Sequence, residues 1–109
     1  MNIKKVTGEK KEYIDLLLLA DEQESMIDKY LEKGEMFVLD DNGIKAECVI
    51  TNENDGIYEL KNIAVLPECQ RKGYGKNLIE FLFNSYIPLY PSKGKQLQTY
   101  LSVAASLLL

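Results

Sequence analysis

The sequence predicts an α/β (α+β) domain in which a mostly antiparallel sheet is flanked by helices. Three observations support this fold class. Strand-like runs are joined by short glycine turns, two apolar segments repeat at helical spacing, and a last strand leads into an amphipathic helix through a glycine loop. The chain has 109 residues, of which 46% are hydrophobic and 28% are charged. This length and composition predict a single compact domain over residues 1–109.

The first third of the chain predicts one strand and two helices. Residues 2–7 can form the strand. Apolar side chains then recur at helical spacing over 13–18 and again over 26–31. Gly34 follows the second of these segments, where a glycine often ends a helix in the left-handed conformation. We therefore expect Gly34 to be a left-handed helix cap.

The middle of the chain predicts three consecutive strands, at 36–39, 44–51 and 57–65. The segments between them, 41–43 and 54–56, read Asp-Asn-Gly and Asn-Asp-Gly, which are strong hairpin turns. An antiparallel meander follows from these turns. With the helix that comes after it, the expected order is β-α-α-β-β-β-α.

Composition excludes several classes of function. The net charge is −4, so the fold as a whole repels nucleic acid. The chain has no histidine, and Cys48 and Cys69 lack the spacing of metal ligands, so we expect no metal site and no histidine-based triad. No stretch approaches the ~20 apolar residues that span a bilayer. The N-terminus also lacks an apolar signal core, which predicts a cytoplasmic protein without membrane contact.

The loop between the last predicted strand and helix has the composition of an anion site. Gly73 and Gly75 carry no β-carbon, so the backbone N–H groups around them can approach a ligand closely. The start of the helix adds a favourable dipole. Arg71, Lys72 and Lys76 place positive charge at the same point. The expected ligand is a pyrophosphate.

Two other phosphate loops do not fit the spacing. A dinucleotide fingerprint needs a third glycine where Leu78 stands. A nucleoside-triphosphate loop needs glycine at position 70 and a hydroxyl residue at position 77, which are Gln70 and Asn77 here. The alternative that remains open is a solvated turn with incidental glycines.

The six residues of this loop resemble the Q/R-x-x-G-x-G/A signature of the GNAT superfamily of acyl-CoA-dependent N-acetyltransferases. They are Gln70, Arg71, Lys72, Gly73, Tyr74 and Gly75. The resemblance implies that this loop, with Lys76, binds the pyrophosphate of the co-substrate acetyl-CoA. It also implies that the preceding strand, at Ile63, Ala64 and Val65, hydrogen-bonds the pantetheine arm.

Acyl transfer to an amine requires a general base. In many members of the superfamily a glutamate on this strand has that role, and the resemblance assigns it to Glu59. The alternative reading of Glu59 is a solvent-facing strand carboxylate. Backbone N–H groups of residues 63–65 would polarise the thioester carbonyl. Tyr100 stands in a predicted strand rather than on the helix that carries the family's acid, so the general acid is unassigned.

The resemblance covers residues 1–87, and 88–109 form a divergent tail. Residues 96–103 alternate well enough to be a fifth strand, but the family's last helix and closing hairpin are not expected. We interpret the tail as truncated or frame-disrupted. The apolar C-terminus favours self-association, and a homodimer would supply the missing wall.

Three functions are compatible with the sequence. The favoured one is an N-acetyltransferase that moves an acetyl group from acetyl-CoA directly to a primary amine. The second is a non-catalytic acyl-CoA-binding remnant of such an enzyme, and the third is an interaction module that binds no nucleotide. The amine acceptor is unidentified. The acidic segment 21–28 has two readings, an attraction for a cationic amine and, more commonly for such runs, a solvated helix face.

Overall fold

The computed structural model describes residues 1–86, so the predicted strand at 96–103 and the rest of the tail lie outside the described residues. The observed elements confirm the predicted order. They are β1 (Asn2–Lys5), the 3-10 helix η1 (Lys10–Tyr13), α1 (Ile14–Ala20), α2 (Glu24–Leu31), β2 (Glu35–Asp40), β3 (Ile44–Asn52), β4 (Tyr58–Val65), the 3-10 helix η2 (Pro67–Cys69) and α3 (Tyr74–Tyr86).

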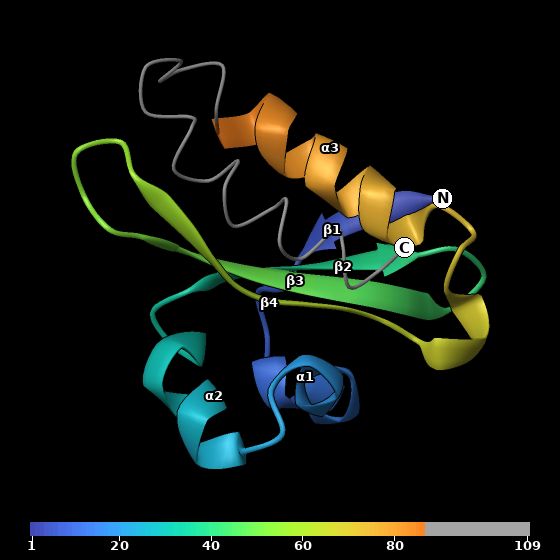
Figure 1. The fold of residues 1–109 in the computed structure, drawn as a ribbon, viewed down its shortest axis with the longest axis horizontal. Coiled ribbons are helices and arrows are strands. Elements are labelled where there is room, and N and C mark those ends of the chain that lie inside the picture. The colour runs from blue at the N-terminus through green and yellow to red at the C-terminus, as the bar shows by residue number, and fades with distance from the viewer. Residues whose placement is uncertain (87–109) are drawn as a thin grey trace.

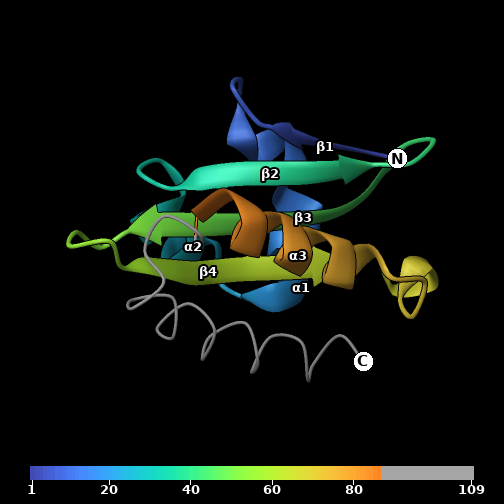
Figure 2. The same cartoon turned by 90° about the horizontal axis from the view of Figure 1, so that it is seen from above.

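The four strands form one sheet in the order β1-β2-β3-β4, and every neighbouring pair is antiparallel. Helix α3 covers one face of this sheet, and α1 and α2 cover the other (Figure 1). Seen from above, α3 runs along the sheet over β3 (Figure 2). The α/β (α+β) fold class predicted from the sequence is therefore confirmed.

Each face of the sheet has its own apolar core, because successive side chains of a strand point to opposite faces. On the α3 face, the sheet side chains pack against Leu78 and Leu82, which are fully buried. The buried members of this cluster are Phe37, Leu39, Ala46, Cys48, Ile50, Leu60, Val65, Cys69, Leu78 and Leu82. On the opposite face the buried cluster is Leu17, Ile27, Tyr30, Leu31, Met36, Val38 and Val49.

Helix α2 ends against a lysine of the 3-10 helix η1. The ammonium group of Lys10 donates to the carbonyl oxygens of Leu31, Glu32 and Gly34 at 2.8, 3.0 and 2.6 Å. These carbonyls have no partner within the helix, and a cation at a helix C-terminus is electrostatically favoured. Lys10 therefore caps α2 and fixes its connection to β2.

The prediction that Gly34 is a left-handed cap is wrong, because Gly34 is not among the glycines with positive φ. The lack of room for a β-carbon explains the glycine instead. A β-carbon at position 34 would lie 2.7 Å from Cγ1 of Val49 and 2.9 Å from the carbonyl oxygen of Tyr30. The chain therefore needs glycine here because α2 and β3 approach its backbone closely.

Candidate functional site

The loop that follows β4 forms the candidate anion site. Strand β4 ends at Val65, and Pro67 begins the short 3-10 helix η2. Arg71 and Gly73 then adopt left-handed conformations, with φ of +66° and +89°. Left-handed residues in such a turn orient neighbouring backbone N–H groups toward one point, which is the geometry of an anion-binding nest. The first helical hydrogen bond of α3 closes the turn, from Asn77 N to Gly73 O at 3.0 Å.

A small hollow of about 40 Å³ lies at this turn. Its lining residues are Val65, Cys69, Gln70, Arg71, Gly73, Tyr74, Gly75 and Lys76. The structure thus brings seven of the sequence-predicted cofactor residues around one space, and Cys69 joins them. Lys72 lies in the same loop but does not line the hollow, and Ile63 and Ala64 lie farther back on β4.

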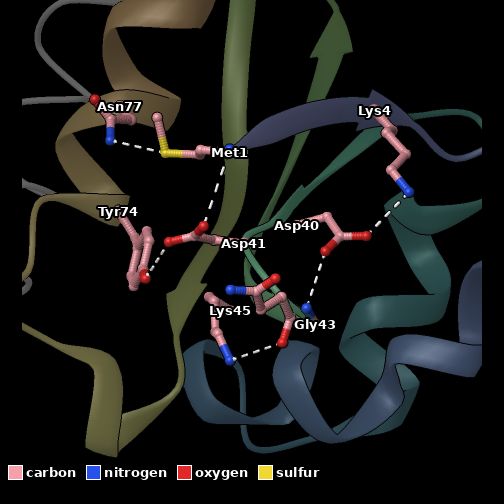
Figure 3. A network of polar contacts seen from close by, with 9 residues as sticks. Met1, Lys4, Asp40, Asp41, Gly43, Lys45, Tyr74 and Asn77 are labelled. Carbon is pink, nitrogen blue, oxygen red and sulfur yellow. Dashed lines mark hydrogen bonds and ion pairs between the residues drawn. The ribbon is translucent and has the colours of Figure 1, made fainter.

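Polar contacts attach this loop to the turn between β2 and β3 (Figure 3). The hydroxyl of Tyr74 donates to Oδ2 of Asp41 at 2.7 Å, and this bond raises the pKa of Tyr74. The N-terminal ammonium of Met1 lies 3.9 Å from Oδ1 of the same carboxylate. Asn77 donates to the sulfur of Met1 at 3.2 Å. The first turn of α3 is therefore held against the hairpin from two sides.

Strand β4 contains an irregularity just before residues 63–65. Val49 of β3 pairs with Asn62, but the next residue, Ile50, pairs with Leu60, so Lys61 has no cross-strand partner. This is a β-bulge, which interrupts the ladder and bends the strand. Beyond β4 no further strand is paired to the sheet within residues 1–86.

Glu59, the predicted base, lies on β4 opposite Thr51. One of its carboxylate oxygens is 2.9 Å from the ammonium of Lys61, and the two side chains are 26% and 25% exposed. Between Glu59 and Val65 the strand is roughly 20 Å long at about 3.3 Å per residue. Glu59 is therefore half-buried and ion-paired, and it lies at the opposite end of β4 from the phosphate loop.

A buried polar group on the α1 and α2 face was not predicted from the sequence. Glu47 of β3 is completely buried, and neither of its carboxylate oxygens has a hydrogen-bond partner among the described residues. Burial raises the pKa of Glu47 well above its ordinary value. Asn62 and Tyr30 are buried on the same face, and desolvation raises the pKa of Tyr30 to about 12. The available signal was a glutamate inside the apolar run 44–50.

Two absences hold for residues 1–86. None of the helices in this part of the chain is both long enough and apolar enough to cross a membrane. In the same part, no group of three or more His, Cys, Asp or Glu side chains could hold a metal ion.

Residues 32–107 match the family model described as an acetyltransferase (GNAT) domain. The chain is also similar to a Bacillus subtilis protein described as uncharacterized N-acetyltransferase YvbK. The two are 38% identical over 69 residues, which are 62% of this chain and 44% of that protein.

Solved structures agree with this match. A Bacillus subtilis acetyltransferase in complex with CoA is 31% identical, with a TM-score of 0.72 over 81% of this chain and 59% of that chain. A GNAT family acetyltransferase from Elizabethkingia anophelis with acetyl-CoA bound is 34% identical, with a TM-score of 0.69 over 75% of this chain and 54% of that chain. The chain spans about half the length of these relatives. On the family model, the curated relative and the shared fold together, the chain belongs to the GNAT family of acetyltransferases.

Proposed function

We propose that this domain transfers an acetyl group from acetyl-CoA to a primary amine by direct transfer in a ternary complex. The observation that carries the proposal is the turn between β4 and α3, where left-handed Arg71 and Gly73 surround a hollow at a helix start. Two similar solved structures hold CoA and acetyl-CoA, which supports the same co-substrate here. Residues 70–76 would bind the pyrophosphate.

The chemistry divides between the backbone and one carboxylate. The cationic amine must lose one proton before its nitrogen attacks the thioester carbon. The C–N bond then forms, the C–S bond breaks, and the second proton of the nitrogen passes to the sulfur, so that CoA leaves as the thiol. We assign Glu59 as the base that accepts the first proton. Its carboxylate would leave its ion pair with the ammonium of Lys61 and pair with the cationic amine instead. Those N–H groups of residues 63–65 that point away from β3 would stabilise the oxyanion that develops on the carbonyl.

Calorimetric titration of acetyl-CoA into the purified chain tests the co-substrate site. Gly73→Trp should abolish saturable binding, because the indole would fill the loop and the left-handed φ strains any side chain. The matched control is Gly8→Trp, at an exposed glycine whose added β-carbon would meet nothing within 4 Å. Both variants are first shown to be folded by circular dichroism.

Release of the CoA thiol tests transfer, with a panel of a polyamine, lysine and a peptide N-terminus as acceptors. Glu59→Gln should lower turnover by about 10²- to 10⁴-fold, the contribution typical of a general base, and leave acetyl-CoA binding intact. A folded chain that binds no acetyl-CoA would contradict the proposal.

A second candidate function is acyl-CoA binding without transfer. It is favoured by the ion pair between Glu59 and Lys61, which occupies the carboxylate assigned as the base. Saturable acetyl-CoA binding with no thiol release for any amine would select it. The amine acceptor, the cytoplasmic location and a homodimer stay predictions from the sequence.

A further inference from the structure

Asn62 lies at the point where β4 departs from regular pairing. It is the residue directly after the bulge at Lys61, and its cross-strand partner is Val49. Only 3% of Asn62 is exposed, although its side chain is an amide in the middle of a strand. A buried amide costs free energy unless its polar atoms are hydrogen-bonded, and the oxygen Oδ1 of Asn62 has no partner among the described residues. The side chain of Asn62 therefore needs hydrogen-bond partners within the protein.

The amide nitrogen of Asn62 bonds to both helices on its face of the sheet. It donates to the carbonyl oxygen of Leu17 in α1 and to the hydroxyl oxygen of Tyr30 in α2, each at 3.0 Å. Tyr30 in turn donates to Oδ2 of Asp21, in the link between α1 and α2, at 3.3 Å. One side chain thus connects β4 to α1 and to α2, through residues that are 45 and 32 positions away along the chain.

The bulge explains why such an anchor is needed. Lys61 has no cross-strand partner, and within residues 1–86 the far edge of β4 pairs with no strand. The backbone there has fewer ladder hydrogen bonds to fix it. The next three residues, 63–65, carry the N–H groups assigned above to the acyl carbonyl. A displacement of about 1 Å in such groups can cost on the order of 100-fold in rate.

We propose that Asn62 is a positioning residue, whose amide holds the bulge of β4 against α1 and α2 and so aims the N–H groups of residues 63–65 at the acyl carbonyl. This inference rests on the proposed function. Tyr30 supports this position, because its hydroxyl accepts one of the two hydrogen bonds from Asn62. Neither side chain touches the reacting atoms, because both lie beneath the strand and act through its backbone.

The test measures carbonyl polarisation and needs no amine acceptor. Acetyl-CoA labelled with ¹³C at the thioester carbonyl is bound to the full chain, and the carbonyl stretching frequency is read by isotope-edited infrared difference spectroscopy. The affinity of the same probe is measured by calorimetry. Hydrogen bonds from correctly aimed N–H groups lower the stretching frequency of the bound carbonyl.

Three variants separate positioning from stability. Asn62→Leu keeps the approximate volume but cannot donate, so it should still bind acetyl-CoA and lose most of the frequency shift. Tyr30→Phe removes one of the two acceptors and should lose part of the shift. Val49→Ala, at the cross-strand partner of Asn62, should destabilise the fold yet keep the full shift, because the bonds of Asn62 remain.

A carbonyl frequency shift that is unchanged in Asn62→Leu would overturn the inference. A shift that Val49→Ala loses as fully as Asn62→Leu does would also overturn it. If Asn62→Leu does not fold, Tyr30→Phe decides: a full shift in that variant overturns the proposal. Wild-type protein that binds the probe without any shift would also refute it while leaving the co-substrate site intact. Folded wild-type protein that binds no probe would remove the proposed function and this inference together.

Discussion

The two faces of the sheet differ in what they bury. Under α3 the buried sheet and helix side chains are apolar, and the edge-to-face pair of Phe37 and Phe81, with ring centroids 4.9 Å apart, extends this packing. Under α1 and α2 the same four strands bury three polar side chains. These are Glu47, Thr51 and Asn62.

This difference indicates separate tasks for the two faces. Apolar burial is the dominant favourable term in folding, so the α3 face contributes stability and supports the helix that begins at the phosphate loop. Buried polar groups cost free energy, and a charge without a partner costs the most. A protein that tolerates Glu47 and Asn62 on one face gives up stability there, which makes that face the place to look for positioning and chemistry. Four substitutions test this comparison.

The largest effect is expected at the centre of the α3 face. Leu78→Ala should lower the free energy of unfolding by about 3 kcal/mol, through lost burial and the cavity left behind. Urea denaturation followed by circular dichroism measures the change. The matched control is Leu19→Ala on α1, where the side chain is 49% exposed and the change should stay within about 0.5 kcal/mol. Equal effects at both leucines would remove the distinction between the α3 core and the surface.

The next largest loss of stability is expected at Gly34, in the connection between α2 and β2. Gly34→Ala should destabilise the protein by about 1 to 3 kcal/mol, because the new methyl group would press on Val49 and on the backbone oxygen of Tyr30. Thermal unfolding reports the loss. Gly8→Ala is the control, since its methyl group meets nothing within 4 Å. A stabilised Gly34→Ala variant would show that α2 shifts easily and that this face is less tightly packed than described.

Glu47 tests the comparison of the two faces through the pH dependence of stability. Burial raises its pKa in the folded state, so above the unfolded-state pKa of about 4.3 the unfolded chain loses this proton first. The contribution of Glu47 to stability is therefore fully present below that pH. It is lost at about 1.4 kcal/mol per pH unit as the pH rises toward the folded-state pKa.

Glu47→Gln cannot titrate, so it should be more stable than the wild type at pH 7, and the gap should narrow toward pH 5. Unfolding free energies at several pH values between 5 and 8 measure this gap. Glu22→Gln, at an exposed position, is the control and should show no such trend. A gap that does not change with pH would mean that Glu47 is ionised in the folded protein.

The smallest effect is expected at the attachment of α3 to the hairpin. Tyr74→Phe removes the 2.7 Å bond to Asp41 and should cost about 0.5 to 1.5 kcal/mol of stability. A double-mutant cycle with Asp41→Ala isolates the pair, and the coupling should account for most of the loss. Additive effects of the two substitutions would show that the bond does not hold the loop.

Much of the fold was predictable because its signals are local. The turns at 41–43 and 54–56 contain residues with positive φ, such as Asn42 and Asp55, as hairpin chemistry requires. Strand β4 ends at Val65, as the predicted strand 57–65 does, and helix α3 follows the glycine loop as expected. The candidate phosphate loop was found for the same reason, since its glycines and basic residues are adjacent in sequence.

The remaining features depend on partners that are distant in sequence. The role of Gly34 was mispredicted, because the close approach of Val49 from β3 decides it. The ion pair between Glu59 and Lys61 was not predicted. It depends on both side chains sharing one face of β4 despite the bulge between Leu60 and Asn62. No local pattern reports such contacts.

The sequence by itself therefore determined the order of the elements, the two hairpins and the glycine loop, because turn chemistry and apolar periodicity act over a few neighbouring residues. Only the tertiary structure decided which polar side chains are buried. Glu47 and Asn62 look like ordinary strand residues until α1 and α2 cover them, and the bond from Asn62 to Leu17 joins positions 45 residues apart. Burial depends on which element lies above a side chain, and that is settled only when the whole chain has packed.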